Sequence, residues 1–174
     1  MLKAGVLGAG HLGKIHLKLL QQSERYELVG FYDESDAMAT SVVKEFGYHR
    51  FESIEALIAA CDMVDVVTPT THHFECAEQV IKAGKHLFIE KPITQTVEQA
   101  VAIRELAKKH GVRGQVGHVE RFNPALISAR EKLGTVQFIE CHRLAPFKKR
   151  GADVDVVLDL MIHDLDIILS LIDA

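Results

Sequence analysis

The chain has 174 residues, of which 48% are hydrophobic and 25% are charged, a balance typical of a globular protein and not of a disordered one. Acidic residues outnumber basic ones by 24 to 20, and the one short basic run is Lys148, Lys149 and Arg150, so we expect no nucleic-acid partner. No apolar run approaches the roughly 18 residues that cross a bilayer. The strand signal that begins at Leu2 leaves no room for a signal segment, so we expect a cytoplasmic protein without a membrane partner.

Short apolar strands alternate with helical segments over the first two thirds of the chain. The strand signals lie at residues 2–7, 27–32, 63–67, 86–90 and 114–119, and the helix signals at 11–22, 36–46, 53–60, 72–83 and 96–110. Thr96 and Gln99 suit a capping box at the start of the last of these helices, and Gly111 suits its end. This alternation implies βαβ units, so the predicted fold class is α/β with a parallel sheet covered on both faces.

The helix signals also predict which side chains face the core. For residues 11–22 the predicted apolar face consists of Leu12, Ile15, Leu19 and Leu20. For residues 96–110 the predicted apolar face consists of Val97, Ala100, Val101, Ile103, Leu106 and Ala107.

The rhythm changes after Arg121. A helix is predicted around 124–133, a longer strand at 135–144, then a basic loop and an amphipathic helix from about 154 to 172. A single strand leaves two rows of backbone groups unpaired and therefore needs a neighbour. Three explanations stay open: the chain is a fragment of a longer protein, the strand pairs with another chain in a homo-oligomer, or this part of the chain is poorly ordered.

The three cysteines, Cys61, Cys76 and Cys141, are odd in number and widely spaced. This pattern predicts neither a disulfide framework nor a zinc cluster, so we interpret them as reduced, mostly buried thiols. The ten histidines are mostly scattered singly, and a lone histidine is more often packed or solvated than a ligand. We predict no metal site.

A glycine-rich turn joins the first strand to the first helix. Gly8, Gly10 and Gly13 have the spacing GxGxxG, in which the first glycine permits the tight turn, the second lets a pyrophosphate approach, and the third lets helix and strand pack closely. The phosphates would lie at the helix N-terminus, at His11 and Leu12, where free N–H groups and the helix dipole favour an anion. The turn therefore predicts a Rossmann-type, doubly wound sheet that binds a dinucleotide.

An acidic residue, Asp33, closes the second strand 25 positions after Gly8. This is close to the roughly 20 residues expected for the acid that binds the adenosine ribose hydroxyls. A carboxylate there would repel a ribose phosphate, and no Arg or Lys lies between Tyr32 and Val43. The sequence therefore favours NAD over NADP.

The stretch HLFIEKPITQT places Glu90, Lys91 and Pro92 where a buried strand ends. Ligands of such sheets bind at the carboxyl ends of the strands, so the Lys91 ammonium is expected to face the nicotinamide end of the cofactor. There it could donate to a substrate oxygen and stabilise an alkoxide. Glu90, which we group with the cofactor-binding residues, would hold the lysine in place. An ordinary surface ion pair at a strand end is the competing interpretation.

Five stretches, GAGHLG, TPTTHH, EKPIT, VGHVERFNP and DLMIHDLD, in this order and spacing, resemble the Gfo/Idh/MocA oxidoreductases, the family of glucose-fructose oxidoreductase and inositol dehydrogenase. The resemblance implies NAD(P)-dependent hydride transfer to or from a secondary hydroxyl of a sugar, polyol or sugar nucleotide. It implies that Lys91 is catalytic and contacts the substrate. It also implies that Thr68, Pro69 and His73 lie along the cofactor.

The resemblance implies the domain organisation as well. Family members continue after the cofactor domain with a large, mostly antiparallel sheet that covers the substrate. We therefore expect an NAD-binding Rossmann domain over residues 1–121 and the incomplete N-terminal part of an α+β substrate and oligomerisation domain over residues 122–174. A homo-oligomer is the expected assembly.

The resemblance further implies that His163 is an acid/base, oriented by Asp159. Periodicity alone favours a different interpretation, because Asp155, Asp159, His163, Asp166 and Ser170 form one polar stripe on an apolar helix, typical of a solvated face. The supporting chemistry is local: Asp159 and His163 are four residues apart, so the carboxylate can orient the imidazole, and a neutral ring can take a hydroxyl proton. A third ligand at a fitting spacing is missing, so we reject a metal at this pair.

A narrower resemblance lies in QVGHVERFNPA, which is similar to sugar-nucleotide members of the family, UDP-N-acetylglucosamine 3-dehydrogenases in particular. It implies that His118, Arg121 and Asn123 contact the substrate, with Arg121 able to bind a phosphate or carboxylate bidentately. An ion pair between domains is the competing interpretation for Arg121. A non-catalytic NAD-binding or redox-sensing module, and an isomerising or hydrolysing relative that uses NAD transiently, remain alternative functions.

Overall fold

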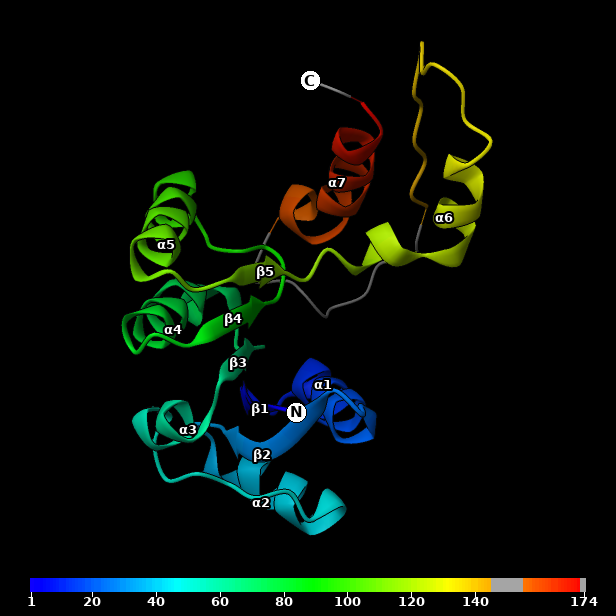
Figure 1. The fold of residues 1–174 in the computed structure, drawn as a ribbon. Helices are drawn as coiled ribbons and strands as arrows, with labels where there is room; N and C mark the ends of the chain where they lie inside the picture. The colour runs from blue at the N-terminus through cyan, green and yellow to red at the C-terminus, as the bar shows by residue number, and fades with distance from the viewer. Residues whose placement is uncertain (145–154, 173–174) are drawn as a thin grey trace. The chain divides into compact units, whose positions relative to one another are not determined.

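The computed structural model describes residues 1–144 and 155–172, which fall into two compact units, residues 1–116 and residues 117–174. The first unit is a parallel sheet with helices on both faces (Figure 1). Its strands are β1 Leu2–Leu7, β2 Tyr26–Tyr32, β3 Met63–Val66, β4 His86–Ile89 and β5 Gly114–Val116, and its helices are α1 His11–Gln22, α2 Asp36–Phe46, α3 Ile54–Ala60, α4 Thr70–Lys82 and α5 Val97–His110. The predicted α/β class is confirmed.

The strands run in the order β2-β1-β3-β4-β5, and each pair of neighbours is parallel. A parallel bridge between Phe31 and Arg50 adds the beginning of a further strand beside β2. With that bridge counted, the order corresponds to the 3-2-1-4-5-6 arrangement of dinucleotide-binding sheets. The direction of winding reverses between β1 and β3, so the crevice for a ligand is expected at the carboxyl ends of these two strands.

Alternate residues of the strands pack against two separate helical layers, because successive side chains of a strand point to opposite faces. Ala4 and Val6 of β1 pack with Leu17 of α1 and Val42 of α2. On the opposite face, buried residues of α3, α4 and α5 pack against the sheet: Leu57, Ile58, Cys76, Ala77, Val80, Ile81 and Ile103. Figure 1 shows α1 and α2 on one side of the sheet and the other three helices on the second side.

The prediction of the buried face of α1 was largely wrong. The helix buries Gly13, Leu17 and Leu20, whereas Leu12, Ile15 and Leu19 are exposed. The reason lies at Gly13, where an added Cβ would lie only 2.0 Å from the carbonyl oxygen of Gly8. This contact between backbones fixes which side of the helix faces the sheet, whatever the apolar side chains elsewhere would favour.

Helix α5 begins with the predicted capping box of Thr96 and Gln99 and ends at Gly111 in the left-handed conformation. Its predicted apolar face is only partly covered: Ile103 is buried, while Val97 and Val101 are exposed. The exposed residues line an open apolar groove of about 440 Å³ between α5 and the edge strand β5. The face is therefore correctly apolar, but within residues 1–116 one edge of it lacks a covering element.

The second unit contains the 3-10 helix η1 Val119–Phe122, helix α6 Pro124–Arg130, the π-helical segment η2 Val157–Met161 and helix α7 Ile162–Leu171. The predicted helices at 124–133 and 154–172 thus form over most of their length. The predicted strand at 135–144 does not form, because no described segment pairs with these residues and a strand without a neighbour leaves both rows of its backbone groups unpaired. The basic run 148–150 lies outside the described residues.

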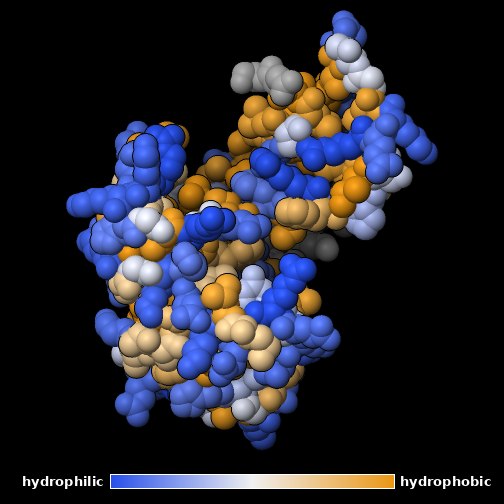
Figure 2. Space-filling model, in the orientation of Figure 1, coloured by the Kyte–Doolittle hydropathy of each residue, from blue (hydrophilic) through white to orange (hydrophobic). Residues whose placement is uncertain are grey.

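The interpretation of the polar stripe of α7 as a solvated face is wrong at its centre. Asp166 is only 8% exposed, whereas the apolar residues Met161, Leu165 and Leu169 are exposed. Figure 2 shows apolar surface over α7. The polar side of this helix faces inward because Asp166 forms an ion pair with a side chain of η1, described below.

Candidate functional site

The turn between β1 and α1 has the geometry that a diphosphate requires. Gly8 has φ of +95°, and its backbone N–H donates to the carbonyl oxygen of Tyr32 at 2.9 Å. An added Cβ at Gly8 or Gly13 would collide with backbone atoms, but one at Gly10 would meet nothing within 4 Å. Two of the glycines are therefore needed for packing, and the third leaves open space beside the turn, as the fingerprint predicts.

The N-terminus of α1 has neither a side-chain cap nor an acidic residue in its first turn. Gly10 is the N-cap and makes no side-chain capping bond, and the first turn contains no acidic residue. His11 and Leu12 are exposed at this end. The first N–H groups of this twelve-residue helix therefore receive no acceptor from its own cap or first turn, which fits a bound phosphate.

Asp33 lies beside the glycine turn, and its contact with the adenosine ribose stays a prediction. Its Oδ2 accepts a hydrogen bond from the N–H of Ala9 at 2.7 Å, and its Oδ1 accepts one from the N–H of Ser35 at 2.8 Å. Each carboxylate oxygen keeps a second lone pair, so these bonds hold the side chain without exhausting its capacity to accept from ribose hydroxyls.

A basic residue that the sequence argument missed, Arg50, reaches the same corner. Its guanidinium donates to the carbonyl oxygen of Asp33 at 3.2 Å and to the carboxylate of Asp36 at 2.6 Å. Arg50 does not follow the second strand directly in the chain but reaches its end through the bridge to Phe31. Its charge is paired with Asp36, so the corner keeps an acid at Asp33 and a neutralised cation next to it.

The carboxyl ends of β1, β3 and β4 meet beside this turn. The N–H of Val67 donates to the carbonyl oxygen of Leu7 at 2.8 Å, and the N–H of Glu90 donates to that of Val66 at 3.0 Å. These bonds bring the loop with Thr68 and the loop with Lys91 to one edge of the sheet. This is the edge at which the sequence analysis expected the ligand, and the roles of Thr68 and Lys91 there stay predictions.

The buried ring of His73, in α4, contacts the backbone of both loops. It is 1% exposed, its Nδ1 lies 2.8 Å from the carbonyl oxygen of Pro92, and its Nε2 lies 2.9 Å from that of Thr68. The ring therefore sets the spacing between the loop that starts at Thr68 and the loop that carries Lys91. A direct contact of His73, Thr68 or Pro69 with the cofactor stays a prediction.

A buried cluster of charged groups that the sequence analysis did not identify lies at the same edge. His16 of α1 places Nδ1 2.8 Å from Oδ2 of Asp65 in β3, and Nε2 3.3 Å from Oε1 of Glu90. The side chains of His16, Asp65 and Glu90 are 15%, 5% and 11% exposed. The available signal was Asp65 itself, because a carboxylate inside an apolar strand requires a partner.

The electrostatics of this cluster favour a charged ring. Burial opposes protonation of His16, but hydrogen bonds and charges from Asp65 and Glu90 outweigh it and raise the pKa of His16 from 6.5 to about 10. Burial raises the pKa of Asp65, and the ring opposes that rise. Burial also opposes ionisation of Glu90, yet hydrogen bonds from His16 and the N–H of Lys91 lower the pKa of Glu90 overall.

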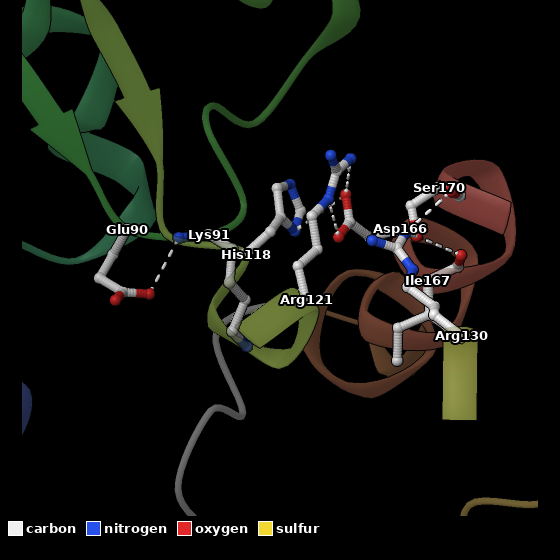
Figure 3. A network of polar contacts seen from close by, with 8 residues as sticks. All are labelled: Glu90, Lys91, His118, Arg121, Arg130, Asp166, Ile167 and Ser170. Carbon is white, nitrogen blue, oxygen red and sulfur yellow. Dashed lines mark hydrogen bonds and ion pairs between the residues drawn. The ribbon is translucent and has the colours of Figure 1, made fainter. Parts of the chain in front are cut away.

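Glu90 holds Lys91 through the main chain. The second oxygen of its carboxylate, Oε2, accepts a hydrogen bond from the N–H of Lys91 at 3.0 Å, marked by a dashed line in Figure 3. Lys91 is half-buried. Glu90 therefore holds the backbone of Lys91, whereas its hold on the ammonium and the catalytic role of that ammonium stay predictions.

The predicted substrate residues of the second unit make contacts with one another or with nearby groups. Arg121 donates from Nε and Nη2 to the two oxygens of Asp166, both at 2.6 Å, and Nδ1 of His118 lies 3.8 Å from the same carboxylate (Figure 3). The hydrogen bond from Arg121 is the main cause that lowers the pKa of Asp166. Asn123 caps α6 by accepting from the N–H of Ala125 at 3.0 Å.

These contacts bear on the substrate predictions. Two donors of Arg121 are engaged by Asp166, a residue that the sequence analysis had placed on a solvated stripe. Asp159 lies in η2 and His163 in the first turn of α7, and both are half-buried. Their catalytic roles, and the substrate contacts of His118, Arg121 and Asn123, stay predictions.

Two further findings concern the classes of site. Within residues 1–144 and 155–172, no three His, Cys, Asp or Glu side chains are grouped so that they could hold a metal ion. In the same residues, no helix combines the length and the apolar character that crossing a membrane requires.

Comparison with known proteins gives consistent matches. The family model described as "Oxidoreductase family, NAD-binding Rossmann fold" matches residues 2–118. UDP-N-acetylglucosamine 3-dehydrogenase of Acidithiobacillus ferrooxidans is 41% identical over 174 residues, which is 99% of this chain and 55% of that protein. A solved structure of that dehydrogenase from the same organism matches with a TM-score of 0.91 and 41% identity, over 98% of this chain and 56% of that one.

Relatives of lower identity match as well. Glucose-6-phosphate 3-dehydrogenase of Bacillus subtilis is 32% identical over 157 residues, 87% of this chain and 44% of that protein. A solved structure in complex with NAD, of a protein from gentamicin A biosynthesis, matches at 27% identity with a TM-score of 0.71, over 75% of this chain and 38% of that one. The chain spans about half the length of the curated relatives it matches.

Proposed function

Because this chain belongs to the oxidoreductase family with an NAD-binding Rossmann fold, we propose that it forms the cofactor half of an NAD-dependent dehydrogenase of sugar-nucleotide hydroxyls. The observation that carries the proposal is the position of Lys91. Lys91 directly follows β4 at the carboxyl edge of the sheet, and its backbone is held by Glu90. The glycine turn follows β1 at the same edge. Bound NAD would supply the hydride acceptor there.

The residues of the first unit fit that cofactor. The open space at Gly10 and the uncapped N-terminus of α1 suit the diphosphate, and the carboxylate of Asp33 suits the adenosine ribose. Arg50 is paired with Asp36, so it offers no unneutralised cation for a ribose phosphate. These features favour NAD over NADP.

The proposed chemistry divides between two groups of residues. The Lys91 ammonium donates to the oxygen of the reacting hydroxyl and stabilises negative charge that develops on it. His163, oriented by Asp159, accepts the hydroxyl proton as general base. The 41% identity to a UDP-N-acetylglucosamine 3-dehydrogenase supports a ring hydroxyl of a UDP-linked amino sugar as the substrate.

The test is hydride transfer, followed as NADH absorbance, from a panel of UDP-sugars and free sugars. We expect Lys91→Ala to bind NAD normally, measured by calorimetry, and to lose turnover by about a hundredfold or more, because charge stabilisation of this kind commonly contributes several kcal/mol. Lys109→Ala is the matched control, since Lys109 is exposed in the last turn of α5. It should change neither quantity.

Two outcomes would contradict the proposal. Unchanged turnover in Lys91→Ala would remove the lysine from the mechanism. NAD binding without turnover of any sugar or sugar nucleotide would instead favour a non-catalytic NAD-binding module. A cytoplasmic location and a homo-oligomeric state stay predictions.

A further inference from the structure

We propose that His16 is a positioning residue that ties the cofactor-binding helix α1 to the backbone of Lys91 through Glu90. The inference rests on the proposed function, because it concerns the lysine that the reaction is expected to use. It assigns a role in turnover to a histidine that lies in the helix after the glycine turn.

The argument begins with the geometry of the ring. Nδ1 of His16 faces the carboxylate of Asp65 in β3 at 2.8 Å, and Nε2 faces that of Glu90, which directly follows β4, at 3.3 Å. The ring also lies edge-on to Phe88, with 5.9 Å between ring centroids. A side chain held from three sides has one orientation, so the ring transmits the position of α1 to the end of β4.

The next step is the division of Glu90 between two partners. One oxygen of its carboxylate faces His16, and the other accepts the N–H of Lys91 at 3.0 Å. A rotation of the carboxylate that follows loss of the ring would also displace the acceptor of the Lys91 N–H. The contacts therefore run without a gap from α1 through His16 and Glu90 to Lys91.

A stabilising role alone does not account for the cluster. Three buried ionisable groups are costly to desolvate, and apolar residues of similar volume commonly give equal or greater stability. Within the described residues, Oδ1 of Asp65 accepts no hydrogen bond, so His16 is its charge partner. Such an arrangement at the ligand edge of a sheet is typical of sites where charged groups serve function.

The test separates positioning from folding and from cofactor binding. We expect His16→Asn to keep the dissociation constant for NAD within about twofold and to lower kcat by about 10- to 100-fold, because a displacement of about 1 Å at a reacting group costs rate at this scale. Gln21→Ala, an exposed position on the same helix, is the matched control and should leave both values unchanged.

A second variant tests whether His16 acts through Glu90. Both oxygens of Glu90 face protein groups, so its effect on the cofactor is expected to be indirect despite its place among the predicted cofactor-binding residues. Glu90→Gln keeps the shape of the side chain and should lower kcat while NAD affinity stays within the same twofold. In the double variant, His16→Asn should add less than about threefold to the loss caused by Glu90→Gln, because the two residues act in one series of contacts. If His16→Asn fails to fold, Glu90→Gln alone must show the split between kcat and NAD affinity.

The outcomes are distinguishable from failure of the proposed function. Unchanged kcat in His16→Asn, weaker NAD binding as its only effect, or multiplicative losses in the double variant would overturn the positioning role while Lys91→Ala still abolishes turnover. Unchanged turnover in Lys91→Ala would overturn the proposed function and this inference together. In that case any loss of kcat in His16→Asn would have to act through a residue other than Lys91.

Discussion

Alanine substitutions at two glycines of the GxGxxG motif should have different effects: Gly13→Ala should lower stability, and Gly10→Ala should weaken NAD binding. At Gly13 the new Cβ would lie 2.0 Å from the carbonyl oxygen of Gly8, and 3.4 Å is the lower limit of ordinary contact. Helix α1 and the turn must therefore separate by at least about 1.4 Å, against backbone atoms that have no alternative rotamer. Overpacking of this kind costs about 1–3 kcal/mol, and we expect Gly13→Ala to lie near the upper end.

At Gly10 the same substitution meets nothing within 4 Å, so the fold has room for it. Loss of a glycine N-cap changes stability by less than about 1 kcal/mol. The added methyl group would, however, stand where the diphosphate must approach the helix N-terminus. We expect Gly10→Ala to weaken NAD binding tenfold or more, which corresponds to about 1.4 kcal/mol or more.

The assay pairs thermal unfolding of the cofactor-free protein with NAD titration by calorimetry. Gly13→Ala should lower Tm by roughly 6–12 °C, taking about 2–4 °C per kcal/mol for a chain of this size. Gly10→Ala should leave Tm within about 3 °C of the unsubstituted protein while losing affinity. The reasoning is refuted if Gly10→Ala binds NAD as tightly as the unsubstituted protein, or if Gly13→Ala unfolds at the same temperature.

Three other predictions follow from the structure. In the native protein, Cys141 should react with a thiol reagent at neutral pH before the two buried cysteines, because burial raises the pKa of Cys61 to about 11 and thiolate is the reactive form; equal rates for all three would contradict this. Asp166→Asn should destabilise the protein to urea by about 1–2 kcal/mol, since it removes the buried partner of the half-exposed Arg121. The unsubstituted protein should have a larger free energy of unfolding than His16→Asn, fully so below pH 6.5, and this difference should disappear as the pH rises to about 10, because folding raises the pKa of His16. Denaturant titrations of both proteins across that range should show the difference in unfolding free energy falling with pH.

The sequence predicted most of the first unit because its signals are local. The capping box of Thr96 and Gln99, the glycine that ends α5, and the alternation of apolar strands with helices each depend on residues close in the chain. The glycine fingerprint is also local, and its three positions have the predicted geometry. The face of α1 was predicted incorrectly because Gly13, with no side chain, carries no hydrophobic signal although its contact orients the helix.

The features that the sequence did not predict depend on residues far apart in the chain. His16 and Asp65 are separated by 49 positions, and Arg121 and Asp166 by 45, so periodicity reveals neither pair. The prediction of a strand at 135–144 was wrong because strand formation also depends on a partner that is distant in the chain. Apolar and β-branched residues in such a run favour an extended conformation, but a strand forms only where another segment pairs with it.

The sheet order explains why charge gathers at the end of an apolar strand. Parallel strands β3 and β4 present their carboxyl ends at one edge, so the acid of each can meet a side chain of the helix that crosses nearby. One carboxylate oxygen of Glu90 faces the His16 ring on α1, and the other accepts a hydrogen bond from the N–H of Lys91. An apolar residue at position 90 would leave both donors without this acceptor, and the lysine loop would lose its link to the cofactor helix. The backbone of Lys91 is therefore one end of a series of polar contacts that starts at His16, in the helix that follows the glycine turn.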